Sequence, residues 1–137
     1  MPGIFVDANV FLRHLLDDDP VKSPACKEFF SSIEKRRLDA WTTSLVIAEI
    51  VFVLSNRKTY NVNRQELSEV LLPLIMLPNL ALERKSLYHR TFDLYASTGI
   101  DYIDAYHAAL VERLNPPGIA SYDTHFDVVP TIQRREP

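Results

Sequence analysis

The sequence lacks the features that mark secreted, disulfide-stabilised and membrane-spanning proteins. Its single cysteine, Cys26, cannot form an internal disulfide, which fits a reducing compartment. No apolar run approaches the ~20 residues needed to cross a bilayer. No basic segment precedes the first apolar run, as one does in a secretory signal. We therefore expect a cytoplasmic protein that does not associate with a membrane.

Internal repeats, linkers and low-complexity segments are also missing. The 137 residues, of which 47% are hydrophobic, predict one domain over residues 1–137 with a genuine core. The net charge of −3 argues against a protein that coats nucleic acid, because such proteins are basic. It does not exclude an enzyme that cuts nucleic acid, since acidic residues gathered at a metal site also lower the net charge.

The segment 3–10 combines the pattern of a buried strand with a carboxylate at its end. Residues 4–6 form a short apolar run that predicts a strand buried on both faces. Asp7 follows directly, and an apolar helical pattern begins at Val10. This places Asp7 where open α/β sheets bind ligands, although Asp is also a common helix N-cap. Asn9 can aim its amide at the same place.

Short apolar strands alternate with helical patterns along the rest of the chain. Thr43 or Ser44 and then Asn63 are the predicted caps of two of the helices. The alternation predicts an α/β fold with a mainly parallel central sheet of four to five strands, covered by helices on both faces. Further strands are predicted at 38–43, 80–82, 119–123 and 131–132, and helices at 10–16, 23–37, 44–54, 64–75, 86–97 and 102–110.

Glu49 is the only charged residue in the apolar helical stretch 45–54. An unpaired buried carboxylate is costly, so we expect Glu49 to have a strong partner, a metal ion or an opening to a cleft. The alternative is that it lies on an exposed stripe of the helix.

Two carboxylates stand at the start of the last predicted helix. Asp101 is placed as its N-cap, which leaves Asp104 in the first turn. Asp101 is therefore interpreted as structural and Asp104 as the candidate ligand. His107 lies one turn after Asp104 and can share its face, although a lone helical histidine is more often a surface or core group.

Four carboxylates are thus expected at one edge of the sheet. Asp7 and Asp123 end two strands, while Glu49 and Asp104 lie in early turns of helices that start at the same edge. Four converging carboxylates cannot all stay ionised without a cation. Ligands that are all oxygen favour Mg²⁺ or Mn²⁺ over zinc. Such an ion can polarise a phosphodiester and lower the pKa of bound water.

The order and setting of these acids resemble a PIN-domain ribonuclease, and in size the chain is most similar to the VapC-type toxins of toxin–antitoxin pairs. The resemblance spreads from residue 3 to residue 127 and implies a PIN-like three-layer sandwich that hydrolyses RNA. The matching motifs are Val6-Asp7-Ala8-Asn9, Thr43-Ser44 with Ala48-Glu49, Asp104-Ala105 with Ala108-Ala109, and Ser121-Tyr122-Asp123 with Phe126.

The resemblance also implies the roles of individual residues and the partners of the chain. Asn9 and Ser121 would support the site, and Asp127 matches less securely. The substrate would be RNA, a small antitoxin would cover the active-site groove, and the protein would form a homodimer. The acids implied to bind Mg²⁺ or Mn²⁺ and to act in catalysis are Asp7, Glu49, Asp104 and Asp123.

Three alternatives stay open. The first is another acid-cluster phosphotransferase, but a haloacid-dehalogenase-type phosphatase needs an acid where Asn9 stands, and the acidic pair and late lysine of a response-regulator receiver are not evident. The second is a PIN nuclease that processes RNA outside toxin–antitoxin systems. The third is a non-catalytic RNA- or protein-binding PIN-like module, which the loss of an acid would favour; none of the four is replaced.

Overall fold

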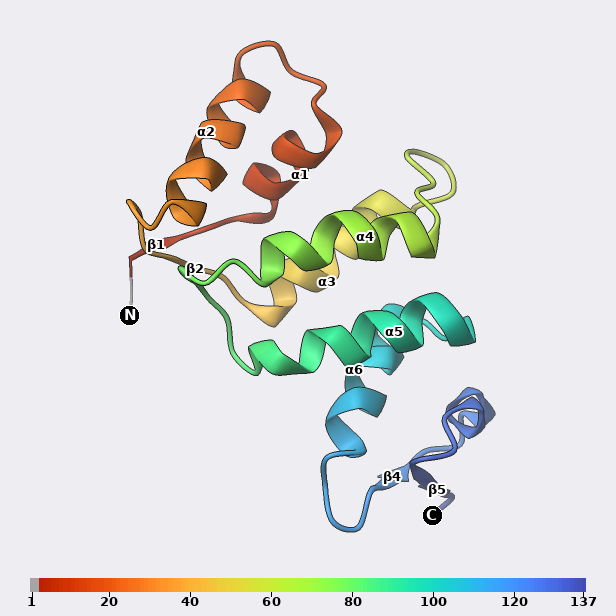
Figure 1. The fold of residues 1–137 in the computed structure, drawn as a ribbon. Helices are drawn as coiled ribbons and strands as arrows, with labels where there is room; N and C mark the ends of the chain where they lie inside the picture. Colours follow the sequence, from red (N-terminus) through yellow and green to blue (C-terminus); the bar gives the residue numbers. More distant parts are fainter. Residues whose placement is uncertain (1–2) are drawn as a thin grey trace. The chain divides into compact units, whose positions relative to one another are not determined.

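The computed structural model describes residues 3–137, which form two compact units that divide between Lys85 and Ser86 (Figure 1). The first unit contains β1 (Ile4–Phe5), α1 (Ala8–Leu16), α2 (Lys22–Glu34), β2 (Ala40–Trp41), α3 (Ser44–Ser55), α4 (Arg64–Ile75) and β3 (Leu80–Ala81). The 3-10 helix η1 (Lys85–Leu87) leads to the second unit, which contains α5 (Tyr88–Thr98), α6 (Tyr102–Val111), β4 (Gly118–Ala120), the 3-10 helix η2 (Thr124–Val128) and β5 (Gln133–Arg135). In this described part of the chain, no helix is long and apolar enough to cross a membrane.

The strands of the first unit form a parallel sheet in the order β1–β2–β3. Ile4 pairs with Ala40 and Ala40 with Leu80, so α1 and α2 connect the first two strands, and α3 and α4 connect the next two. Gly3 precedes β1 with a left-handed φ of 80°. A Cβ added there would lie 1.9 Å from the main-chain oxygen of Asp39, so a side chain at residue 3 would force the backbone to move.

The helices of the first unit pack through their apolar faces. α1 contacts α2 and α3, and α3 contacts α4, which runs beside it in Figure 1. Two predicted caps are confirmed: Thr43 Oγ1 accepts a hydrogen bond from the Val46 amide, and Asn63 Oδ1 accepts one from the Glu66 amide. The buried side chains of this unit include Phe11, Phe30, Ile33, Ile47, Ile50, Leu54, Leu67, Leu71 and Ile75.

The second unit is built on α5 and α6, which pack against each other. Phe92, Tyr95 and Tyr102 form a cluster of rings with centroids 5.4 to 6.4 Å apart. After these helices, β4 and β5 pair in parallel, with Gly118 opposite Gln133. The aromatic cluster is therefore part of the packing between α5 and α6, and the strand pair follows these helices in the chain.

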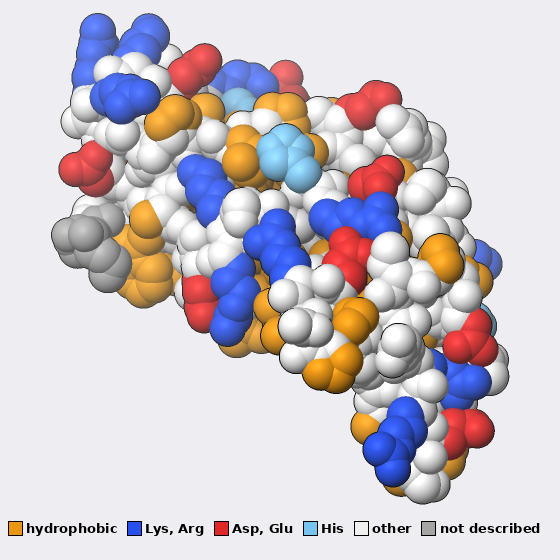
Figure 2. Space-filling model, turned by 60° about the horizontal axis from the view of Figure 1, so that its bottom comes forward, with side chains coloured by type: hydrophobic (Ala, Val, Ile, Leu, Met, Phe, Trp, Pro, Cys, Tyr) orange, Lys and Arg blue, Asp and Glu red, His pale blue; other side chains and the backbone are white. Residues whose placement is uncertain are grey.

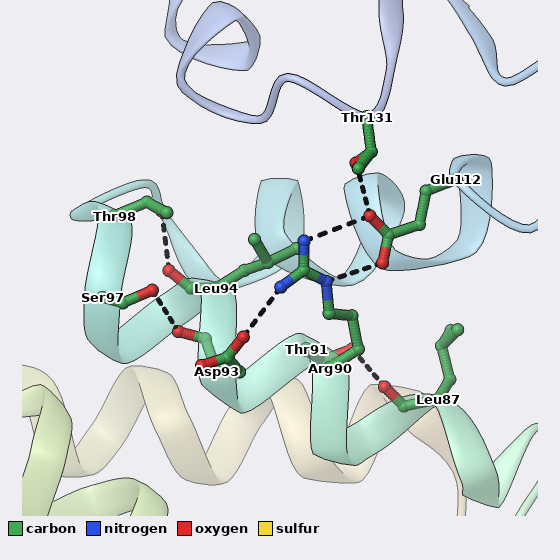
Figure 3. Close-up of polar contacts among 9 residues, drawn as sticks. All are labelled: Leu87, Arg90, Thr91, Asp93, Leu94, Ser97, Thr98, Glu112 and Thr131. Atoms are coloured by element: carbon green, nitrogen blue, oxygen red, sulfur yellow. Dashed lines mark hydrogen bonds and ion pairs between the residues drawn. The ribbon is translucent and has the colours of Figure 1, made fainter.

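A half-buried carboxylate, that of Glu112, ties the end of α6 to two other parts of the second unit. Arg90 of α5 binds Glu112 through Nε to Oε1 at 2.6 Å and through Nη2 to Oε2 at 3.3 Å (Figure 3). Thr131 Oγ1 donates to Glu112 Oε2 at 2.6 Å. Partial burial acts to raise the pKa of Glu112, but the hydrogen bonds from Arg90 and Thr131 outweigh it and hold that pKa below its usual value.

The predicted α/β class with parallel strands is confirmed. Residues 3–137 hold five strands, but these lie in one sheet of three strands and one of two, and not in the single central sheet of four to five strands that was predicted. Two predicted boundaries are wrong. α2 ends at Glu34 and not near residue 37, since Arg36 adopts a left-handed φ of 59°. The last strand begins at Gln133, whose amide donates to Pro117, and not at Thr131.

The prediction that the first strand is buried on both faces is also wrong. Ile4 and Phe5 are 51% and 43% exposed, whereas Val6 is 1% exposed. Position at the edge of the sheet is not sufficient to explain this exposure, because β3 lies at the opposite edge and its Leu80 is fully buried; the rest of the described chain leaves Ile4 and Phe5 uncovered. Phe5 instead contacts the ring of Trp41, with centroids 4.9 Å apart.

Replacing Glu112 with Gln should lower the stability of the protein by on the order of 1 kcal/mol at neutral pH, because it removes the charge from the hydrogen bonds to Arg90 and Thr131. The pKa of Glu112 in the folded protein lies below the usual value of 4.5 for a glutamate. Its stabilising effect is therefore complete above about pH 4.5 and is lost as the pH falls through the folded-state pKa.

Urea denaturation at several pH values measures this difference. Glu83→Gln is the matched control, since Glu83 is paired with Arg84 on the surface and its side chain is 70% exposed. The interpretation of the network is wrong if the two variants lose equal stability, or if the deficit of Glu112→Gln stays constant down to about pH 3.

Candidate functional site

A buried hydrogen bond joins the carboxyl ends of β1 and β2. Thr42 Oγ1 donates to the main-chain oxygen of Val6 over 2.9 Å, and both residues are buried. The Val6 amide in turn donates to Trp41 at 2.8 Å. Val6 precedes Asp7, and Thr42 precedes the residue that caps α3. This contact therefore fixes the start of the Asp7 segment against the start of the helix that carries Glu49.

Asp7 occupies the N-cap position of α1, but its carboxylate does not cap the helix. Its backbone is extended, with φ −80° and ψ 160°, and its main-chain oxygen accepts a hydrogen bond from the Val10 amide. The side chain makes no capping bond and is exposed. The capping interpretation is thus not supported for this side chain, and the carboxylate is accessible to a ligand. Asn9 is also exposed, in the first turn of α1.

Glu49 lies on the exposed face of α3. Leu45 and Phe52, which are one turn away on either side of Glu49, are 80% and 71% exposed. The apolar stretch 45–54 is therefore not buried on all sides, because α3 packs through its other faces. Of the two interpretations of Glu49, the exposed stripe is the one that the structure shows.

Asp104 lies in the first turn of α6, as predicted, and is half-buried. Burial raises its pKa, and the negative charges of Asp123 and Asp101 raise it further, against the opposing effect of His107 and His125. Asp101 holds the N-cap position by its backbone, but its side chain makes no capping bond. The purely structural role predicted for Asp101 is therefore not supported by its side chain, which adds negative charge beside Asp104.

Asp123 is held in a fixed turn beyond β4. The strand predicted over 119–123 ends at Ala120, because Ser121 Oγ accepts a hydrogen bond from the Asp123 amide at 3.0 Å and turns the chain. Asp123 Oδ1 then accepts from the His125 amide at 2.8 Å and lies 2.9 Å from His125 Nδ1. Ser121 thus positions Asp123 directly. The sequence analysis did not identify His125, although its place two residues after Asp123 was a signal.

Asp127 is engaged in an ion pair with Arg134. Arg134 Nε and Nη2 bind its two carboxylate oxygens at 2.9 and 3.2 Å, and Nη1 donates to the main-chain oxygen of Ser121 at 3.1 Å. The hydrogen bond from Arg134 lowers the pKa of Asp127. Asp127 therefore acts through Arg134 on the turn that carries Asp123.

The predicted acids lie as one pair in each unit: Asp7 and Glu49 in the first, Asp104 and Asp123 in the second. Within either unit, over residues 3–85 and 86–137, no three or more His, Cys, Asp or Glu side chains are placed to hold a metal ion. The convergence of all four acids at one edge stays a prediction.

One family model matches the sequence, that of the PIN domain, and the match spans residues 4–132. The chain belongs to the PIN domain family. PIN domains are typically nucleases that depend on divalent metal ions. Among curated proteins, none matches the sequence significantly.

The carboxylates of this PIN domain are chemically suited to a divalent cation. In the second unit, the charges of Asp123 and Asp101 oppose the ionisation of Asp104. A cation held by these groups would favour the ionised form instead, and carboxylate oxygens are the ligands that Mg²⁺ and Mn²⁺ prefer. In the first unit, the exposed side chain of Asp7 offers the same kind of ligand.

Replacing Thr42 with Val should cost about 1–3 kcal/mol of stability, because it leaves the buried oxygen of Val6 without its hydroxyl donor. Thr42→Ser keeps the hydroxyl and should retain more stability than Thr42→Val. Thermal or urea unfolding of the two variants measures the difference. Equal losses would mean that packing of the Thr42 methyl group, and not the hydrogen bond, holds these strand ends together.

Proposed function

We propose that this protein is a metal-dependent endoribonuclease that hydrolyses RNA phosphodiester bonds through an acidic Mg²⁺ or Mn²⁺ site. The observation that carries the proposal is the PIN-domain match over residues 4–132, a range that contains all four candidate acids. The exposure of Asp7 and Glu49 and the mutual repulsion around Asp104 support the same site.

In this proposal, Asp7 and Asp123 hold the metal most directly, and Glu49 and Asp104 complete the acidic cluster. When bound, a Mg²⁺ or Mn²⁺ ion would supply Lewis acidity at the phosphodiester and would lower the pKa of a coordinated water. Carboxylate oxygens of Glu49 and Asp104 accept hydrogen bonds from the attacking water and orient it in line with the leaving oxygen. No covalent intermediate with the protein is needed.

Other polar residues support these acids. The Ser121 hydroxyl holds the Asp123 amide, and the pair of Asp127 with Arg134 holds the main chain at Ser121. Asn9, exposed beside Asp7, is proposed to bind the ion or its water through the side-chain oxygen.

Basic side chains provide the attraction for the RNA backbone. On the face drawn in Figure 2, Lys and Arg side chains occur in several groups, with Asp and Glu among them. Because the net charge is −3, attraction of phosphate has to be local. We propose that Arg13, Arg57, Lys58 and Arg64 contact the RNA backbone, which positions the RNA without reading its sequence.

We further propose that the protein is the toxin of a VapBC-type toxin–antitoxin pair and that it forms a homodimer in the cytoplasm. The exposed side chains of Leu45 and Phe52 support a protein partner, because large apolar groups that lie together on a surface mark interaction sites. They flank Glu49, so an antitoxin that covers this face of α3 would block the acidic site.

The purified protein should cleave RNA with Mg²⁺ or Mn²⁺ and stop when EDTA is added. Asp7→Asn should reduce the rate by on the order of 100-fold or more, since even residues that only support metal ligands cost 10–100-fold when changed. Asp17→Asn is the matched control, because Asp17 is an exposed acid at the end of α1 that lies outside the proposed site.

Cleavage that survives both EDTA and Asp7→Asn would contradict the proposal and point to a contaminating nuclease or another chemistry. Absence of cleavage of all RNAs tested, by folded protein free of any partner, would favour the binding-module alternative. Titration of Mn²⁺ by electron paramagnetic resonance gives a second readout, in which Asp7→Asn should weaken binding and Asp17→Asn should not.

If the gene next to that of this protein encodes a small antitoxin, its product should inhibit RNA cleavage. Leu45→Ser with Phe52→Ser should weaken that inhibition at least about tenfold, since each removes a large apolar contact. Val21→Ser is the control, because Val21 is 76% exposed at the start of α2. If the antitoxin inhibited the unchanged protein, the double variant and Val21→Ser equally, the antitoxin would bind another surface.

A further inference from the structure

Tyr122 presents an exposed aromatic ring beside the proposed catalytic acid Asp123. It is 68% exposed, the most of any aromatic residue among the exposed large hydrophobic side chains except Phe52. In the described residues 3–137, its ring makes no contact with another aromatic ring. Packing within the second unit therefore does not account for an aromatic side chain at this position.

The ring is nevertheless held in place. Tyr122 Oη donates a hydrogen bond to the main-chain oxygen of Pro137 at 3.0 Å. The backbone on either side is also fixed: the Ser121 amide donates to Arg135 at 3.0 Å, and the Asp123 amide donates to the Ser121 hydroxyl. An exposed ring with a fixed backbone and a tethered hydroxyl loses little conformational freedom when it binds a flat partner.

The neighbours of Tyr122 connect this ring to the proposed reaction. Ser121 positions Asp123 through its hydroxyl, and Tyr122 lies between the two. Since consecutive Cα atoms are ~3.8 Å apart, a nucleotide whose phosphate lies at Asp123 has its base within reach of the Tyr122 ring. Single-stranded RNA offers unstacked bases, and proteins bind these by stacking them on aromatic side chains.

We propose that Tyr122 is a stacking platform for a base of the RNA next to the cleaved phosphodiester, and so a substrate-positioning residue. This inference rests on the proposed ribonuclease function. Stacking accepts any base, because every base has a π face, and so Tyr122 contributes to affinity and to the placement of the strand more than to sequence choice. The tether from the hydroxyl to Pro137 orients the ring, and the ring itself makes the contact.

Tyr122→Ala should raise the KM for single-stranded RNA by about tenfold or more, with a smaller effect on kcat, because loss of one base–aromatic stack weakens binding by that order. Tyr122→Phe keeps the ring and should stay within about threefold of the unchanged protein. Leu114→Ala is the matched control, since Leu114 is an apolar side chain of the same unit that is 53% exposed and lies outside the proposed site and the proposed RNA contacts. Mn²⁺ affinity should be the same in all three variants.

A second measurement identifies stacking itself. RNAs with one abasic nucleotide, placed in turn at each position around the cleaved bond, should include one that the unchanged protein binds at least about fivefold more weakly than intact RNA. Tyr122→Ala should bind that abasic RNA and the intact RNA equally, because the same contact is missing from both complexes.

The inference is overturned if Tyr122→Ala keeps the KM of the unchanged protein. It is also overturned if the abasic nucleotide weakens RNA binding by Tyr122→Ala as much as it weakens RNA binding by the unchanged protein. It is also overturned if Tyr122→Ala changes only binding to a protein partner, which would place Tyr122 in a protein interface. Failure of the ribonuclease proposal looks different: Asp7→Asn would then keep full activity, or the unchanged protein would bind no RNA.

Discussion

The hydroxyl of Thr42 makes the contact on which the arrangement of the first unit depends. The strands of this unit are two residues long, so their ladders supply few hydrogen bonds. The bond from Thr42 to Val6 adds a buried side-chain contact where the ladder ends and the chain leaves for the two helices. An unsatisfied buried oxygen at that point would lower the free energy of unfolding by about as much as several surface ion pairs add to it. Asp7 and α3 hold their places because this oxygen has a donor.

The second unit uses its charges in two distinct ways. Glu112 and Asp127 are paired with arginines and hold separate segments together: Glu112 joins α5 to the end of α6, and Asp127 acts on the turn at Ser121 through Arg134. Asp104 has no such arginine among its neighbouring charges, which include other acids. The presence of an arginine partner therefore distinguishes the structural carboxylates from the candidate functional ones. Sequence position alone does not distinguish them, because all of them are acidic residues of the same unit.

Much of the fold follows from local sequence patterns, while the exposure of particular residues does not. The caps at Thr43 and Asn63 and the strands near residues 40 and 80 depend on neighbouring residues, and so the sequence predicts them well. The exposure of Phe5 and Glu49 depends on which faces of β1 and α3 other elements cover. These are long-range properties that periodicity does not encode. The order and residue type of the candidate acids identify them in the sequence. The ion pair between Asp127 and Arg134 is evident only in the structure.

The placement of Glu49 between two apolar side chains links recognition to inhibition. A protein that covers Leu45 and Phe52 removes Glu49 from water as well, and a carboxylate without water or a counterion is strongly destabilised. A stable partner for this face of α3 therefore has to bring a cationic group to Glu49. An arginine or lysine in that position would compete with a metal ion for the same oxygens. A single complementary side chain would then both stabilise the complex and block the proposed metal site.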